Sequence, residues 1–150
     1  MAKEDADKAK VLVIEDSEHS AEHIRETLTT AQGDDITVVV DGASALAALG
    51  ESAYELIVLS LDLLNEDALR LVAQIRAREE LRNLSILVLV EEHEEDALAK
   101  AFEVGAHDYL VRPIEKSELI LRSRTQIRHR RYQERLSNDY QDSLALAVTD

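Results

Sequence analysis

The chain has 150 residues and no cysteine, which excludes a disulfide framework, a cysteine-ligated zinc site and a thiol nucleophile. Hydrophobic residues make up 45% of the chain and aromatic residues 3%, so we expect a folded domain with an aliphatic core. The formal net charge is −14: residues 1–110 carry −16 and residues 111–150 carry +2, and an acidic body of this kind repels nucleic acid.

The N-terminal segment is charged and has no apolar stretch of the kind that signal peptides carry. No apolar run elsewhere is long enough to span a membrane. We therefore expect a soluble, cytoplasmic protein in which residues 1–8 are frayed or disordered.

Short apolar segments alternate with amphipathic ones along most of the chain. The predicted strands are residues 11–14, 36–40, 56–59, 85–90 and 109–111. Helices are predicted around residues 21–31, 43–50, 69–75 and 97–104. Strands that are apolar on both faces and alternate with helices indicate a parallel sheet covered on both sides. Five such units in roughly 115 residues predict an α/β, flavodoxin-like (βα)5 three-layer sandwich with strand order 2-1-3-4-5.

One long helix is predicted from Glu115 to about Val148, because this stretch contains no glycine and no proline. At ~1.5 Å per residue it would be ~50 Å long, so it should project beyond the sheet. Ile120 and Ile127 are expected to pack on the sheet. Farther along, the helix carries a thin apolar stripe formed by Tyr132, Leu136, Tyr140, Leu144, Ala147 and Val148. A polar helix with such a stripe is marginal in water, which predicts a partner.

Candidate functional residues stand at the ends of the predicted strands, where open parallel sheets place their sites. Glu15 and Asp16 follow the first strand, Ser60 the third, Val90 the fourth and Arg112 the fifth. Two adjacent carboxylates in a loop suit Mg²⁺, which takes oxygen ligands. Asp16 is also placed to cap the next helix or to pair with Arg112, and we favour these structural roles.

Three segments at this spacing resemble response-regulator receiver domains: residues 11–16, 54–60 and 105–113. The resemblance covers roughly residues 9–125 and implies a role in two-component signal transduction. It places Ser60 where the family has its phosphoacceptor aspartate, and Tyr109 where it has its switch aromatic.

The departures from the family pattern predict a degenerate receiver. Val90 stands in place of the family's Ser or Thr, and Arg112 in place of its Lys. A serine hydroxyl such as that of Ser60 is a poor nucleophile without a base, and a valine cannot bond a phosphoryl oxygen. We therefore expect a pseudo-receiver that requires no cofactor, with Mg²⁺ bound weakly at best by Glu15, Asp16 and Asp62.

An alternative is a phosphorylatable receiver that uses Asp62 with Mg²⁺. Asp62 lies two residues beyond Ser60, so it would share the same side if the strand continued. We favour a solvated loop carboxylate at this position.

The last helix resembles the linker helix that leads into GGDEF-type cyclase domains. In such regulators one receiver is phosphorylated and a second serves as an adaptor that supports dimerisation. The resemblance implies a pseudo-receiver over residues 9–127 and a linker over residues 128–150 toward an output domain absent from this chain. The implied partners are a phosphorylatable receiver, a GGDEF-type output domain for cyclic-di-GMP signalling and a second copy in a weak homodimer. The chain itself would not be an enzyme.

A further alternative is a nucleic-acid-binding regulator that uses the arginines of the last helix. These are Arg122, Arg124, Arg128, Arg130, Arg131 and Arg135. They lack aromatic interleaving and a reader motif, so we favour pairing with an acidic protein surface and expect no nucleic acid as a partner. Charge pairs across a symmetric contact are expected between Glu103, Asp108 or Glu118 and Arg122 or Arg124.

Overall fold

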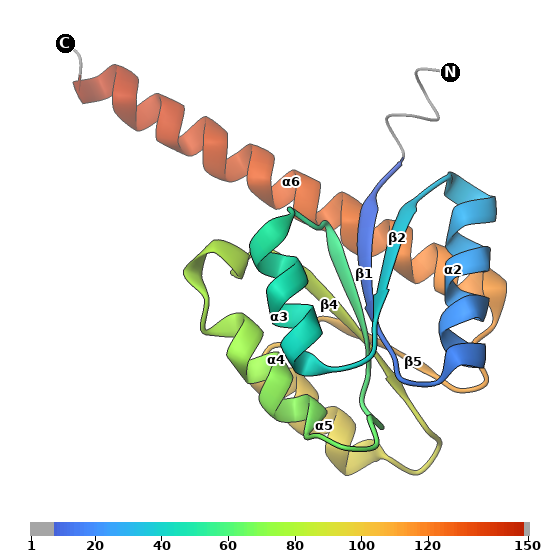
Figure 1. Cartoon of the computed structure of the whole chain (residues 1–150). Helices are drawn as coiled ribbons and strands as arrows, with labels where there is room; N and C mark the ends of the chain where they lie inside the picture. Colours follow the sequence, from blue (N-terminus) through green and yellow to red (C-terminus); the bar gives the residue numbers. More distant parts are fainter. Residues whose placement is uncertain (1–7, 149–150) are drawn as a thin grey trace.

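Five parallel strands form the central sheet in the computed structural model, which describes residues 8–148, with side chains to residue 145 (Figure 1). The strands are β1 Lys10–Ile14, β2 Asp35–Val39, β3 Leu56–Ser60, β4 Ser85–Val90 and β5 Asp108–Val111. Their order across the sheet is β2-β1-β3-β4-β5, and every neighbouring pair is parallel. The predicted α/β three-layer sandwich and its strand order are confirmed.

The helices lie on both faces of the sheet, with α3, α4 and α5 on one side and α2 and α6 on the other (Figure 1). Their bounds are α2 Glu18–Gln32, α3 Gly42–Glu51, α4 Ala68–Arg76, α5 Glu95–Val104 and α6 Lys116–Val148, with a short 3-10 helix η1 at Glu79–Leu81. Strand β1 shows how one segment serves both cores. Leu12 and Ile14 pack under α3 and α4, whereas Val11 and Val13 pack under α2 and α6.

Local chemistry sets where the helices begin and end. Ser17 caps α2 by accepting a hydrogen bond from the backbone N–H of Ser20 at 3.3 Å. Gly33, at φ 70°, ends the helix in the left-handed region that favours glycine. Strand β2 begins and ends one position earlier than predicted and leaves Val40 exposed, and η1 was not predicted at all.

The base of α6 packs on the sheet through residues spaced by four. Leu119, Ser123 and Ile127 are all buried, while Ile120 is only half-buried. The predicted contact through Ile127 is confirmed, but Leu119 and not Ile120 is the second apolar contact. The helix is rotated so that this row of residues faces the sheet.

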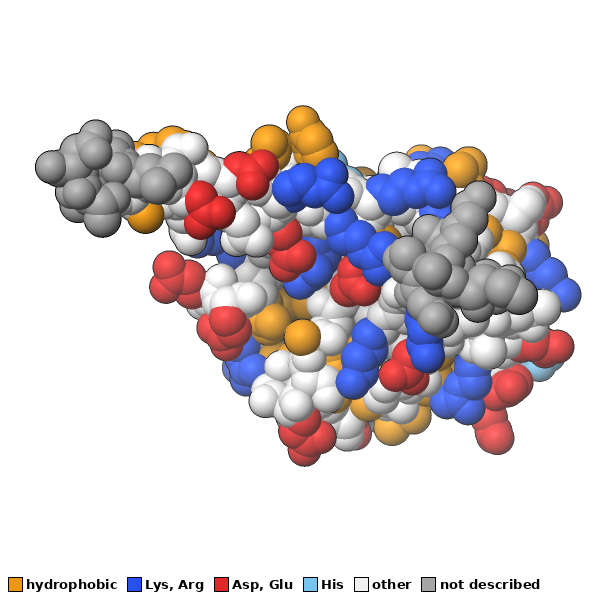
Figure 2. Space-filling view, turned by 90° about the horizontal axis from the view of Figure 1, so that it is seen from above, with side chains coloured by type: hydrophobic (Ala, Val, Ile, Leu, Met, Phe, Trp, Pro, Cys, Tyr) orange, Lys and Arg blue, Asp and Glu red, His pale blue; other side chains and the backbone are white. Residues whose placement is uncertain are grey.

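Ion pairs within the chain fix the same helix. Arg124 pairs with the buried Asp34, and the guanidinium of Arg122 lies 3.0 Å from an oxygen of Asp108. Pairing of these side chains across a symmetric contact stays a prediction, and within the chain they already have the partners named above. Arg124 and Asp34 are buried between α6 and the sheet, whereas Arg122 is 40% exposed. Seen from above, basic side chains gather where the helix crosses the body (Figure 2).

Past Arg131 the helix projects away from the domain (Figure 1). The apolar side chains of Tyr132, Leu136, Tyr140 and Leu144 are 46–66% exposed there. The side chains of Ala147 and Val148, and the predicted frayed segment apart from Lys8, lie outside the described residues. Among residues 8–148, none of the helices is both long and apolar enough to cross a membrane.

Candidate functional site

The site lies at the carboxyl end of the sheet, where the strand order reverses between β1 and β3. Glu15 directly follows β1, and Ser60 is the last residue of β3. Both side chains are buried, at 2% and 0% exposure. Parallel pairing of the two strands therefore brings a carboxylate and a hydroxyl together in a dry setting.

Arg112 joins the groups at these strand ends. Its Nη2 donates to Glu15 Oε1 at 2.9 Å, to Ser60 Oγ at 2.8 Å and to Asp62 Oδ1 at 3.2 Å. Its Nη1 donates to the hydroxyl of Ser20 at 3.0 Å. One guanidinium thus contacts Glu15 just after β1, Ser20 in α2, Ser60 at the end of β3 and Asp62 in the loop after β3.

Asp62 points into this site. Its carboxylate accepts a hydrogen bond from the Ser60 hydroxyl as well as from Arg112, and its side chain is 39% exposed. Asp62 is an exposed loop residue, as expected, but its carboxylate is not surrounded by water alone, because the chain turns after Ser60 and carries this side chain back toward Arg112. Burial raises the pKa of Asp62, but the bond from Ser60 and the charge of Arg112 outweigh it and leave that pKa lowered.

Asp16 lies on the rim of the site and has a different role from either one predicted. Its Oδ2 accepts a hydrogen bond from the backbone N–H of Leu64 at 2.8 Å, so it holds the loop after β3. It does not cap α2, because Ser17 does, and Arg112 pairs with Glu15 instead. Glu15 and Asp16 are adjacent in the sequence, but after the turn that follows β1 they bond different partners, Arg112 and Leu64.

Val90 is the last residue of β4, and Tyr109 lies in the neighbouring strand β5. Val90 is 2% exposed, and its side chain offers no hydrogen-bonding group at the end of β4. Tyr109 packs edge to face against Phe102, with the ring centroids 6.1 Å apart. Glu91, the residue after Val90, reaches back so that its Oε1 lies 3.4 Å from Nε of Arg112.

Sequence reasoning missed two members of the site, Ser20 and Glu91. Ser20 lies inside a helix, and Glu91 belongs to the acidic run just before α5, where carboxylates are favourable for a purely local reason. The position of Glu91 directly after the fourth predicted strand is the signal that could have identified it.

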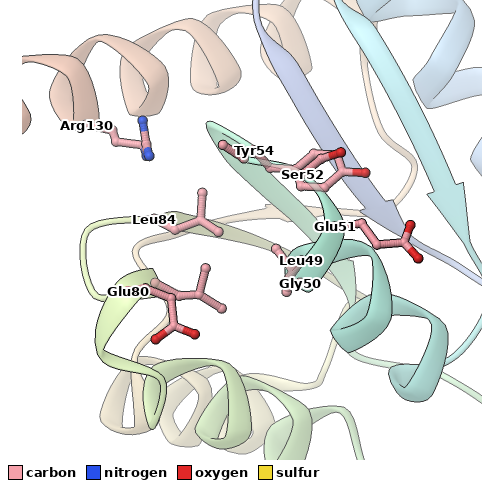
Figure 3. A pocket seen from close by; sticks show the side chains of 10 residues that line it. Leu49, Gly50, Glu51, Ser52, Tyr54, Glu80, Leu84 and Arg130 are labelled. Carbon is pink, nitrogen blue, oxygen red and sulfur yellow. The ribbon is translucent and has the colours of Figure 1, made fainter.

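A second hollow lies at the opposite, amino end of the sheet and has a volume of about 330 Å³ (Figure 3). Leu49, Tyr54 and Leu84 form its apolar side, and Arg130 of α6 points toward it. Arg130 already pairs with Glu134 at 2.9 Å. The chemistry-bearing groups therefore gather at the strand ends around Arg112 and not in this hollow.

The fold and these strand ends define a receiver domain, and comparison with known proteins agrees. The chain belongs to the response regulator receiver domain family, whose model matches residues 11–124. The family resemblance predicted from the three sequence segments is confirmed.

Among known proteins, the chain is similar to the response regulator PleD of Caulobacter vibrioides, with 33% identity over 142 residues. The match covers 94% of this chain and 30% of PleD, so most of PleD lies outside it. Among solved structures, the Francisella response regulator 1452 receiver domain is 26% identical with a TM-score of 0.72, covering 81% of this chain and 98% of that chain. Chemotaxis response regulator CheY4 of Vibrio cholerae shares the fold, with a TM-score of 0.71 at 24% identity over 80% of this chain and 98% of that one.

The site does not fit the divalent cation that a receiver with an acidic pair implies. Arg112 donates hydrogen bonds to the carboxylates of Glu15 and Asp62, and the backbone N–H of Leu64 donates one to the carboxylate of Asp16. In the part of the chain that the structure describes, no group of three or more His, Cys, Asp or Glu side chains could hold a metal ion.

Proposed function

We propose that this domain is a pseudo-receiver: an adaptor that takes no phosphoryl group and relays a signal through α6. One observation carries the proposal. The group at the phosphoacceptor position is the hydroxyl of Ser60, which is buried, donates to Asp62 and accepts from Arg112.

The surroundings of Ser60 oppose its use as a nucleophile. A hydroxyl attacks only when a base removes its proton, and a carboxylate whose pKa is lowered is a poorer base. Asp62 is such a carboxylate. The oxygen of Ser60 also accepts from the charged Arg112, which withdraws electron density from it. Val90 offers no hydroxyl to hold a transferred phosphoryl group.

The attachment of α6 supports the relay. Arg124 fixes the helix to Asp34, and Arg131 fixes it to Glu55 with a bond of 2.9 Å from Nη2. Beyond these anchors the helix continues without interruption to Val148 and carries the exposed stripe centred on Leu136. A rigid helix with an apolar stripe suits a weak homodimer and a mechanical link to a following domain.

Similarity to PleD extends over nearly the whole chain, beyond the part that the family model matches. It supports a parent protein in which this adaptor sits beside a phosphorylatable receiver and a GGDEF-type output domain, and so supports a role in cyclic-di-GMP signalling. A receiver domain is not itself catalytic, so any cyclase activity would belong to the output domain.

Treatment with acetyl phosphate and Mg²⁺, followed by intact-mass measurement, tests the pseudo-receiver directly. We expect no phosphoryl mass on this chain while a phosphorylatable receiver treated in parallel is labelled. Beryllofluoride should likewise leave the backbone NMR signals of residues 60–64 in place. A stable adduct that maps to Asp62, and is absent from Asp62→Asn, would overturn the proposal.

A receiver phosphorylated on Asp62 is the alternative function, because the side chain of Asp62 points into the site and is 39% exposed. A nucleic-acid-binding role has less support. Arg122, Arg124 and Arg131 are engaged by Asp108, Asp34 and Glu55, so their charges already have partners within the domain.

A further inference from the structure

Three carboxylates surround one guanidinium at the carboxyl end of the sheet. Glu15, Asp62 and Glu91 all lie within 3.4 Å of a nitrogen of Arg112. Glu15 is 2% exposed and Arg112 16%, so water screens the nearest of these charges poorly. Carboxylates gathered in this way raise one another's free energy unless a cation lies among them.

One oxygen of Glu15 and one oxygen of Asp62 already accept hydrogen bonds from the same nitrogen of Arg112. Glu15 Oε1 and Asp62 Oδ1 both accept from Nη2 of Arg112, at 2.9 and 3.2 Å. The guanidinium therefore lies where the two carboxylates converge.

We propose that Arg112 is the resident cation of this site, taking the place of Mg²⁺ and making the strand ends independent of metal. The guanidinium links the end of β1 to the end of β3 and to the loops that follow β3 and β4. A lysine has three donors on one nitrogen, so it could not also place nitrogens beside Ser20 and Glu91, as Nη1 and Nε of Arg112 do. The domain is thereby held in one arrangement.

The ionisation of Arg112 agrees with this role. Burial lowers its pKa, but the charge of Glu15, and after it that of Asp62, outweighs burial, so the pKa of Arg112 is raised. The guanidinium therefore stays charged at neutral pH. The inference rests on the proposed function in one respect: a site that takes no phosphoryl group never has to release Arg112.

Thermal unfolding of the full chain with EDTA or with excess Mg²⁺ tests the inference. The wild-type unfolding temperature should not depend on Mg²⁺. Arg112→Gln should lower it by at least about 4 °C in EDTA, and Mg²⁺ should restore at least about half of that loss. Arg122→Gln is the matched control, because it breaks one ion pair with Asp108 away from this site. It should lose stability that Mg²⁺ does not restore.

Recovery of Arg112→Gln by Mg²⁺ no greater than that of Arg122→Gln would overturn the inference, as would wild-type stabilisation by Mg²⁺. If Arg112→Gln does not fold, Mn²⁺ added to the wild type decides. Selective broadening of the amide signals of Asp16 and Asp62 overturns the inference, and unchanged signals support it. Both outcomes differ from failure of the proposed function, which would appear as a phosphoryl adduct whatever the metal dependence.

Discussion

At the scale of single residues, His107 shows how a fixed hydrogen-bond pattern sets a protonation state. Its Nδ1 accepts from the backbone N–H of Ile86 at 3.1 Å and lies 2.9 Å from Nη2 of Arg76. Both neighbours are donors, so this nitrogen must keep its lone pair. Burial first, and then the charges of Arg76 and His129, lower the pKa of His107 to about 4.

This environment predicts an acid-sensitive contribution to stability. The unfolded histidine takes up a proton near its ordinary pKa of 6.5, but the folded one does so only near 4, so the free energy of unfolding falls as pH drops through that window. Because part of the ring is exposed, we expect a loss of about 1 kcal/mol. Urea unfolding at about pH 7 and about pH 5 should show a smaller fall for His107→Gln than for the wild type. The exposed His19→Gln should behave like the wild type; an equal fall in all three proteins would contradict this assignment.

At the scale of secondary-structure elements, the strands could be predicted because each is an apolar run with no competing pattern. Strands β3 and β4 are buried at every position, and both were predicted to within one residue. Parallel strands have their carboxyl ends at the same edge of the sheet, so Glu15, Ser60 and Arg112 were predicted to lie together. What could not be predicted is where long side chains point. Arg112 meets Glu15 across 97 positions of sequence, and no local pattern encodes that contact.

The same limit applies to α6. Absence of glycine and proline predicted its length, and its spacing predicted the exposed stripe. The partners of its arginines depend on how the helix is rotated on the sheet, and that rotation is set by Leu119, Ser123 and Ile127 together with the Arg124–Asp34 pair. Local periodicity leaves such a rotation uncertain by one residue, which is enough to exchange Leu119 for Ile120.

The exposed stripe of α6 predicts weak self-association. Exposed ion pairs contribute little, so burial of apolar surface around Leu136 should supply most of the affinity. Leu136→Asp should abolish the concentration-dependent rise in sedimentation coefficient that we expect of the wild type. Asn138→Asp adds the same charge about 200° away around the helix and should leave association intact. If both variants sediment like the wild type, the stripe is not the contact.

At the scale of the whole molecule, the site and the departing helix lie at opposite ends of the sheet. The site is at the carboxyl ends of β1 and β3, and α6 leaves the body beside Tyr54, which precedes β3 (Figure 3). The contacts that fix α6 to the domain reach farther along the helix than the predicted boundary at residue 127. Arg131 bonds both oxygens of Glu55 and the backbone carbonyl of Lys8, which ties the helix to the entry of the sheet.

Two truncations measure how much of α6 is stabilised by contacts with the rest of the domain. A chain ending after Arg131 keeps every anchor described for α6, so its unfolding temperature should match that of the full chain. A chain ending after Ile127 loses the bonds from Arg131 to Glu55 and Lys8, which should lower the free energy of unfolding by about 1 kcal/mol because these groups are partly exposed. Full-length Arg131→Gln separates loss of the anchor from loss of helix length and should reproduce most of that decrease. If all four proteins are equally stable in urea unfolding, the stabilising contacts of α6 end at residue 127, and the helix beyond that residue adds nothing to the stability of the domain.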